Sequence, residues 1–328
     1  MDLDAYVAEH DGEWRRLEQL SRTGRLAPAE TDEMLMLYQR ASTHLSVVRS
    51  RMPDPLVVAR LSGLVLMARS SITGTGDLAR RRFLRFFTHT FPLACYQARY
   101  WWAGTAFGFV VVVAVLIGYV AANPQVQAQL WSPQEIQSLV NHSFADYYSE
   151  YRNENFALRV WTNNAQIAAI ALVGGALILP TLWVLWQNAL NLGLTGGVMV
   201  GNGRADLFFG LIAPHGLLEL GAVLLAAAVG LRIGWSWIVP AAGYSRSRSL
   251  AAAGRSGIMV ALGLVAVLAV AGLIEGFVTP NLPGLVAIPI GAFALSGFLV
   301  YVVMRGRAAI AEGYDADPDA ERRAVGSG

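Results

Sequence analysis

Four long stretches of this chain contain no Asp, Glu, Lys or Arg, and they restrict the folds that the chain can adopt. They cover residues 101–134, 160–203, 207–218 and 257–274. A helix needs about 20 mostly apolar residues to cross a bilayer. The chain is 55% hydrophobic and only 15% charged, whereas roughly a quarter of an ordinary soluble domain is charged. We therefore expect an all-α, polytopic membrane protein.

The charged residues argue against several other classes of protein. All 25 Lys and Arg residues are Arg, and the net charge is only +2. Since most of these Arg residues flank apolar segments, lipid headgroups explain them better than nucleic acid does. Cys95 is the only cysteine, which leaves no intrachain disulfide and no multi-cysteine metal site. We expect no nucleic-acid partner, no cofactor and no metal.

Residues 1–76 predict a cytoplasmic bundle of three soluble helices. In the first helix the apolar residues recur at helical spacing, at Leu3, Val7, Trp14 and Leu17. The third is expected to begin with Asp54 as its N-cap and Pro55 in its first turn. Gly74 and Gly76 then end the bundle.

Residues 77–100 predict an amphipathic elbow helix at the membrane surface. Four basic residues stand among phenylalanines in this segment: Arg80, Arg81, Arg82 and Arg85. Such a segment suits the anionic cytoplasmic leaflet, and we expect these side chains to contact lipid headgroups. Because the Arg cluster precedes the first crossing, the N-terminus is expected in the cytoplasm.

Between the first two crossings, residues 132–157 predict an amphipathic helix on the outer side. Ser132 and Glu135 have the spacing of a capping box. The apolar and aromatic residues that follow fall on one helical face: Ile136, Leu139, Val140, Phe144, Tyr147, Tyr148 and Tyr151. This face either lies against the outer leaflet or the bundle, or docks a partner protein.

Residues 160–203 are too long for a single crossing, since one helix would extend about 66 Å against a hydrocarbon core of ~30 Å. Pro180 and the glycines after it are expected to divide the stretch into a crossing at 165–186 and a glycine-rich pass at 188–201. A re-entrant loop is the competing geometry for that pass. Three further crossings are expected, at 207–231, 257–277 and 285–304.

The transmembrane domain, residues 101–305, thus has about six membrane segments. This number leaves the basic residues of two polar segments on one side: Arg232, Arg246, Arg248, Arg255, Arg305 and Arg307. Basic residues favour the cytoplasm, so both termini are expected there. Residues 306–328 predict a disordered cytoplasmic tail.

Glycine spacing predicts close helix packing in two places. Gly104 with Gly108, and Gly193 with Gly197 and Gly201, recur every four residues, as they do where helices approach closely in membranes. We expect packing within the chain, with a homodimer as the alternative.

Ionisable side chains inside the apolar segments form the candidate site. His215 and Glu219 lie four residues apart on one helix face, and Glu275 lies near the end of the next crossing. Because a charge at the bilayer centre costs a few kcal/mol, we expect these polar residues to form a buried cluster: His215, Glu219, Glu275, Asn188, Asn191 and Thr279. The cluster either holds helices together by hydrogen bonds, or binds a proton, an ion or a lipid headgroup. A metal site is the least favoured interpretation.

Motifs of known catalysts are missing from the sequence. It contains neither the His-Glu-x-x-His of zinc hydrolases nor the Gly-x-Ser-x-Gly of a nucleophile elbow, and a phosphate-binding loop would need a Lys that the chain lacks. We assign no catalytic residue.

Several segments together resemble the stage II sporulation protein M family. They are APHGLLELGAVLLAAAVGLRIG at 213–234, NALNLGLTGG before it, LIEGFVTP at 273–280, LYQR at 37–40 and FLRFFTHTFP at 83–92. The N-terminal helical domain and the long outer loop are similar to those of the larger, actinobacterial-type members. The resemblance implies an integral membrane partner of peptidoglycan-remodelling enzymes, or of a MoxR-type ATPase system in bacteria that do not sporulate.

We therefore expect a non-enzymatic scaffold of the bacterial cell envelope, in the plasma membrane, that recruits envelope-remodelling partners. The alternative is a transporter or channel-like protein that uses His215, Glu219 and Glu275 along a polar path. An intramembrane hydrolase is a third hypothesis.

Overall fold

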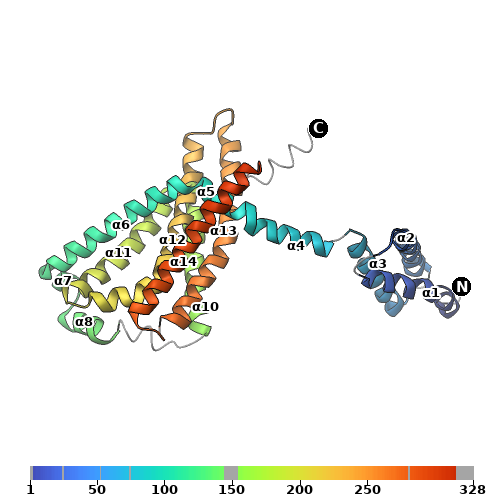
Figure 1. Cartoon of the computed structure of the whole chain (residues 1–328), viewed down its shortest axis with the longest axis horizontal. Helices are drawn as coiled ribbons and strands as arrows, with labels where there is room; N and C mark the ends of the chain where they lie inside the picture. Colours follow the sequence, from blue (N-terminus) through green and yellow to red (C-terminus); the bar gives the residue numbers. More distant parts are fainter. Residues whose placement is uncertain are drawn as a thin grey trace. The chain divides into compact units, whose positions relative to one another are not determined.

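The chain divides into two helical units (Figure 1). The computed structural model describes residues 3–23, 26–51, 53–73, 75–143, 154–279 and 281–314, and the regular secondary structure of these residues is entirely helical. Unit 1 covers Met1–Arg85, and the second unit, Phe86–Gly328, is called the membrane unit. The expectation of an all-α, polytopic membrane protein is confirmed.

Three helices form the core of unit 1: α1 (Leu3–Arg22), α2 (Pro28–Arg51) and α3 (Pro55–Thr73). Large apolar side chains from all three are buried together, among them Trp14, Leu17, Met34 and Leu61. Burying each such side chain stabilises a domain in water by about 1.5–3 kcal/mol. The predicted start of the third helix is confirmed, because Asp54 Oδ1 accepts the backbone N–H groups of Leu56 and Val57, each at 2.9 Å.

One face of α3 points away from this core and is apolar. Leu56 and Leu66 are 81% and 66% exposed. By length and composition alone, Pro55–Ile72 would suffice to cross a membrane, although its other face packs Leu61 and Ala68 into the core of unit 1. α3 is therefore a core helix with an exposed apolar face.

The segment that was predicted as one elbow helix consists of three parts. They are α4 (Thr75–Arg85), a π-helical turn η1 (Phe86–Thr90) and α5 (Phe91–Gln97). A regular helix is interrupted because Pro92 has no N–H to donate to Thr88 O. Instead, Arg305 Nε donates to Thr88 O at 2.9 Å, and Tyr301 Oη donates to Phe87 O.

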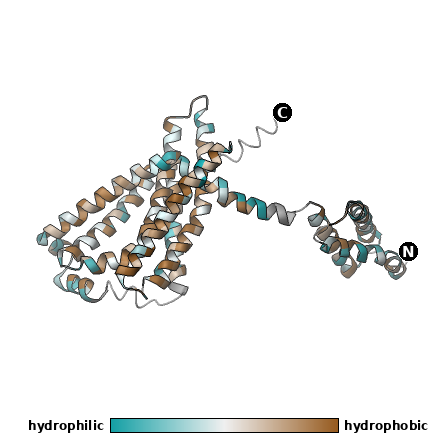
Figure 2. Ribbon diagram, in the orientation of Figure 1, coloured by the Kyte–Doolittle hydropathy of each residue, from teal (hydrophilic) through white to brown (hydrophobic). Residues whose placement is uncertain are grey.

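The four Arg residues of the predicted elbow lie on α4 in unit 1. Arg80, Arg81, Arg82 and Arg85 are all exposed, and the coloured part of α4 in Figure 2 is mostly hydrophilic. Their contact with lipid headgroups stays a prediction.

In the described part of the membrane unit there are six long helices: α6 (Arg99–Ala122), α10 (Glu154–Gly174), α11 (Leu179–Gly201), α12 (Ala205–Ile238), α13 (Arg246–Leu273) and α14 (Gly284–Ala311). Hydrophobic residues predominate along these helices (Figure 2). α6, α12, α13 together with the π-helical turn η4 (Ile274–Val278), and α14 are each long and apolar enough to cross a membrane.

The helix α11 extends along the bundle beside α6 and in the same direction. Gly193 lies against Leu116, and further along both helices Gly201 lies against Ala121. A re-entrant loop would turn back before reaching this end. The glycine-rich pass is therefore a continuous helix.

Contacts at the helix ends define two faces of the bundle. On the first face, Arg305 binds Thr88 at the start of the membrane unit, and Trp235 near the end of α12 packs on Trp101. On the second face, Arg204 Nε donates to Val140 O at 3.2 Å. The six helices run alternately between these faces, so the membrane unit begins and ends on the same side.

The predicted division of residues 160–203 is wrong in its position. A short 3-10 turn, η3 (Gly175–Leu177), separates α10 from α11 well before residue 187. Ile178 there adopts a positive φ of 64°, and Thr181 Oγ1 donates to Ala171 O at 2.6 Å. Pro180 occupies the first turn of α11, where its missing N–H costs nothing.

Glycines allow several helices to approach at backbone distance. A Cβ on Gly230 of α12 would lie 2.5 Å from the carbonyl oxygen of Ala171 in α10. The expectation of internal packing is confirmed for Gly193, Gly197 and Gly201, which face α6: Leu116, Val120 and Ala121. It is wrong for Gly104 and Gly108, because a Cβ on either would meet no atom within 4 Å.

Residues 124–143 cover the second face with α7 (Pro124–Leu130), α8 (Pro133–Ser138) and a π-helical turn η2 (Leu139–Ser143). The predicted capping box of Ser132 and Glu135 is confirmed. Val140 is buried beside Phe208, with Ile136 and Leu139 packed around them. These three side chains of the predicted docking face are therefore packed against the chain itself. The others, Phe144, Tyr147, Tyr148 and Tyr151, lie outside the described residues.

The last helix extends beyond its predicted end. α14 continues to Ala311, so the expected disordered tail is wrong for residues 306–311. Gly306 packs against Tyr96, and His89 Nε2 pairs with Glu312 Oε2 at 2.9 Å. These contacts hold the end of the helix on the bundle. Residues 315–328 lie outside the described part of the chain.

Candidate functional site

The candidate site lies where α12 meets the π-helical turn η4. His215 follows Pro214 inside α12, and Glu219 lies one turn further along the same face. Glu275 belongs to η4, which directly continues α13. A π-helical turn inserts one extra residue per turn and is frequent at functional sites. Here it extends the spanning helix and carries Glu275 toward α12.

His215, Glu219 and Glu275 lie close enough together to surround one small ion. One nitrogen or oxygen atom from each lies within 4.8 Å of the other two. His215 Nε2 is 3.7 Å from Glu275 Oε1, and His215 Nδ1 is 3.3 Å from Thr279 Oγ1. The structure thus brings together four of the six residues that were predicted to cluster.

The cluster is almost closed to the surface of the chain. His215 is 5%, Glu275 4% and Thr279 4% exposed, and Glu219 is half-buried. Glu275 Oε2 is buried and accepts no hydrogen bond from the residues that the structure describes. A buried carboxylate oxygen without a donor costs free energy, so this oxygen is available to a proton or a cation.

The two Asn residues of α11 lie apart from this cluster. Asn188 is half-buried and donates from Nδ2 to Val184 O, one turn earlier on its own helix, at 2.8 Å. Asn191 is exposed, so its predicted burial is wrong. Their spacing of three residues placed both on one side of α11, but nothing in the sequence showed which side faces the bundle.

A large cavity close to the cluster has a different character. It has a volume of about 610 Å³ and lies between α6, α12 and α14, lined almost entirely by apolar side chains such as Phe109, Leu220 and Leu299. It is bordered by Gly216 but not by His215. A cavity of this kind suits a lipid tail, not an ion. The polar cluster is therefore the better candidate site.

Chemically, the cluster offers carboxylate oxygens, an imidazole and a hydroxyl around one small volume. These groups can share a proton or hold a small cation, and they can also hydrogen-bond with one another to join α12 and η4. Backbone contact supports the position of His215 from the other side, because Gly291 of α14 lies against Pro214 O. The site is thus held by three different helices.

Sequence reasoning missed a second group of this composition in unit 1. His10 and Glu13 on α1 approach His44 on α2. The spacing of His10 and Glu13 puts both on one side of a helix and was a usable signal. Their approach to His44 depends on how α1 packs on α2, which the spacing does not show.

Comparison with known protein families decides which family the membrane unit represents. The family model of stage II sporulation protein M matches residues 106–280, more than half of the chain. The chain belongs to this family. The match includes His215, Glu219 and Glu275, so the whole candidate cluster lies in the stage II sporulation protein M part of the chain, whereas α14 lies beyond it.

A separate family model, a domain of unknown function, matches residues 4–74. This range corresponds to the three-helix core of unit 1. A different family model thus matches each unit. No curated protein and no solved structure matches the chain.

Proposed function

We propose that this protein is a scaffold of the bacterial cell envelope, in which the membrane unit is an anchor and unit 1 recruits partner proteins. The observation that carries this proposal is the separation of the two units. Each has a core of its own, and a different family model matches each. An anchored module of this kind needs no chemistry of its own.

The packing of the membrane unit supports a role as a fixed anchor. Gly175 lies against Gly230, and Gly263 against the ring of Phe91. Such backbone-close packing leaves no space for the helices to slide without separating. We infer that the bundle holds unit 1 at the membrane instead of moving during a cycle.

The exposed apolar face of α3 is the proposed recruiting surface. The MoxR-type ATPase system is the proposed partner at this surface, because the family resemblance implies it and an ATPase shares the cytoplasm with unit 1 in the proposed orientation. Peptidoglycan-remodelling enzymes, which the resemblance also implies, would be recruited on the outer side of the membrane. Leu56→Glu with Leu66→Glu should abolish co-purification of the ATPase with the full chain, while Gln39→Glu, on the exposed side of α2, should not. Glu275→Gln should also leave recovery unchanged. Equal recovery with the Leu56/Leu66 variant would contradict the recruiting role.

The polar cluster favours a second candidate function, the movement of protons or small cations across the membrane. Its motivation is the buried Glu275 Oε2 beside His215 and Glu219. In proteoliposomes, uptake that is lost in Glu275→Gln, with the bundle still folded, would support transport over a purely anchoring role. Vesicles that show no flux above protein-free vesicles would exclude it.

The proposed orientation places both ends of the chain in the cytoplasm and the protein in the plasma membrane. Arg246 and Arg248 on the first face support it, since basic residues favour the inside. Cys95 is fully buried and should not react with a thiol reagent. A cysteine at Ser143 should therefore be labelled from outside intact cells, and one at Ser247 or Ser21 should not. Labelling of Ser247→Cys from outside would reverse the orientation.

A further inference from the structure

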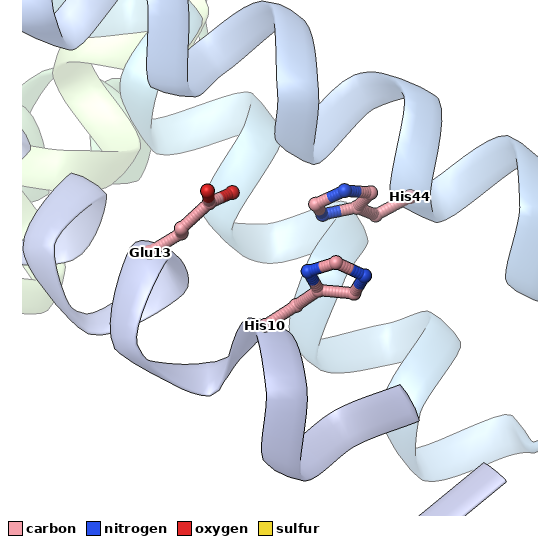
Figure 3. Close-up of side chains that lie close together, drawn as sticks. All are labelled: His10, Glu13 and His44. Carbon is pink, nitrogen blue, oxygen red and sulfur yellow. The ribbon is translucent and has the colours of Figure 1, made fainter. Parts of the chain in front are cut away.

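Unit 1 contains a cluster of metal-binding side chains that the scaffold role does not use. His10 and Glu13 are three residues apart on α1, and His44 reaches them from α2 (Figure 3). One nitrogen or oxygen atom from each of the three lies within 4.8 Å of the others. All three residues are half-buried, so the cluster is reachable from solvent.

The two imidazole rings lie directly against each other. Their centroids are 4.1 Å apart with an interplanar angle of 24°. Tyr6 packs edge-on against His10, with centroids at 4.5 Å, and so restricts its ring. Two histidines are thus held at the same place by packing, before any ion binds.

Glu13 contributes a carboxylate with one oxygen in use and one without a donor. Arg40 Nη1 donates to Glu13 Oε1 at 2.7 Å. Glu13 Oε2 is buried and has no hydrogen-bond partner among the residues that the structure describes. A buried oxygen of this kind costs free energy unless a proton or a cation satisfies it.

We propose that His10, Glu13 and His44 form a binding site for a divalent transition-metal ion of the zinc class. Two imidazole nitrogens and one carboxylate oxygen are a ligand set that such ions use when they also keep an open position. The fourth position of a tetrahedral ion would be left to water or to a side chain of a partner protein. Because the ligands come from both α1 and α2, the bound ion would hold these two helices together.

Metal binding requires the two imidazole rings to turn as well as approach, because their lone pairs lie in the ring planes and two stacked rings do not point at one ion. Zinc binds nitrogen and oxygen at about 2.0–2.1 Å, which puts tetrahedral ligand atoms roughly 3.4 Å apart. The present spread of up to 4.8 Å therefore has to shrink by about an ångström or more. Rotations about the side-chain bonds supply this movement while both helices stay in place.

Protonation of His44 and its hydrogen bonding have opposite effects on metal binding: the low pKa favours it, and the hydrogen bond from Trp14 opposes it. Burial lowers the pKa of His44, with a further lowering by neighbouring His10, which favours the neutral ring that a metal needs. Trp14 Nε1 donates to His44 Nδ1 at 3.1 Å, so the indole and an ion compete for this ring. Glu9 and Glu13 lie close enough to His44 to attract a cation, and Arg40 opposes them.

The test is Zn²⁺ titration of the full chain in detergent after treatment with a chelator, in a Glu275→Gln background that disables the cluster of the membrane unit. We expect one equivalent to bind. His10→Gln, His44→Gln and Glu13→Gln should each weaken binding at least tenfold, since even the loss of an outer-shell partner costs about 10–100-fold. Co²⁺ bound in place of Zn²⁺ should show the visible absorption of a tetrahedral complex, and this should be lost in the same variants.

Two matched variants separate the site from binding at the surface. Glu18→Gln removes a carboxylate of α1 that pairs with Arg22, and His89→Gln removes a histidine of the membrane unit. Neither should change Zn²⁺ affinity by more than about twofold, a fraction of 1 kcal/mol. Trp14→Phe removes the competing donor and should leave the affinity equal or higher. A tenfold loss in Trp14→Phe would contradict the assigned competition and the proposal with it.

Three results would contradict the proposed metal site. They are the absence of Zn²⁺ binding in the Glu275→Gln background, unchanged affinity in the two His variants, and unchanged affinity in Glu13→Gln. Glu13→Gln keeps an oxygen for Arg40 and a side chain of the same size, so it decides the question even if a His variant fails to fold. Circular dichroism of each variant reports the folding.

Discussion

Unit 1 and the membrane unit are both helical, but different side chains hold their helices together. In unit 1, bulky residues such as Trp14 and Leu17 fill the space between helices. In the membrane unit, several helices approach one another at backbone distance where they carry glycine, for example Gly175 with Gly230. Lipid tails are as apolar as Leu, so burial of a large side chain gains little in a bilayer, whereas close backbone packing gains dispersion energy. The medium around each unit, water or lipid, therefore determines which side chains hold its helices together.

The two His/Glu clusters differ in a related way. In unit 1, Glu13 has Arg40 and His44 has Trp14 as hydrogen-bond partners. In the membrane unit, Thr279 and Glu275 lie beside His215 within a largely apolar core. The first cluster can be charged and hydrated, because solvent reaches it. The second must balance its charges internally, so changes there should affect the bundle more directly.

The largest expected effect is a cavity in the core of unit 1. Leu17→Ala removes a side chain that is fully buried and should destabilise unit 1 by about 2–5 kcal/mol. Hydrogen exchange of α1, α2 and α3 in the full chain would measure this loss. Leu56→Ala, at an exposed position of α3, is the control and should change stability by about 0.5 kcal/mol or less. Similar effects of both changes would contradict the assigned core.

In the membrane unit, the corresponding change is the addition of one methyl group. Gly230→Ala would place a Cβ 2.5 Å from Ala171 O, and the resulting displacement of α10 should cost about 1–3 kcal/mol. Titration with a denaturing detergent would measure it. Gly108→Ala meets open space and should cost nothing. If Gly108→Ala were as harmful as Gly230→Ala, glycine packing would not be what holds this bundle.

A smaller effect is expected in the polar cluster. Glu275→Leu removes the carboxylate beside His215 Nε2 and should destabilise the bundle by roughly 1–2 kcal/mol, because the imidazole is left with fewer partners in an apolar core. Glu275→Gln keeps an oxygen at this place and should cost less. The same detergent titration compares them. Equal costs would show that hydrogen bonding at Glu275 contributes nothing to stability.

The sequence predicted which ionisable residues form this cluster, because helix spacing and the cost of burying a carboxyl group can both be judged without knowing how the helices pack. His215 and Glu219 had to share a helix face, and the cost of a bilayer-buried carboxyl indicated that Glu275 would seek a partner. Asn191 was assigned wrongly because spacing shows which residues share a face, but not which face turns inward. The burial of α11 depends on where Gly193 and Gly201 meet α6, which is a property of the whole bundle.

The helix boundaries were less predictable than the helices themselves. Pro180 was expected to act inside a helix, yet it begins α11, since the preceding break at Ile178 depends on the tertiary contact between Gly175 and Gly230. At η1, Pro92 is a local signal for the interruption, but the side chains that bond the freed carbonyl groups, Arg305 and Tyr301, lie more than 200 residues away. Contacts between residues so far apart in the chain leave no pattern in the neighbouring sequence.

The smallest expected effect is the acid dependence of unit 1, which the membrane unit should not share. Asp11 accepts Arg15 Nε at 2.6 Å and Arg60 Nη2 at 2.8 Å, and these hydrogen bonds hold the pKa of Asp11 below its usual range. Arg16 forms a two-bond contact with Glu33, at 3.0 and 2.8 Å, and lowers the pKa of Glu33.

Since both pKa values are lower in the folded chain, the stabilisation is fully present above the unfolded pKa, about 4. It is lost as the pH falls below this value and through the folded pKa. Hydrogen exchange of unit 1 at a series of pH values should show this loss, and the Asp11→Asn, Glu33→Gln double variant should weaken it. Because these ion pairs remain in contact with solvent, the change should be small and should decrease in high salt. Asp32→Asn, at an exposed position of α2, is the control and should retain the wild-type acid dependence. If the double variant retained it too, these pairs would not be its source.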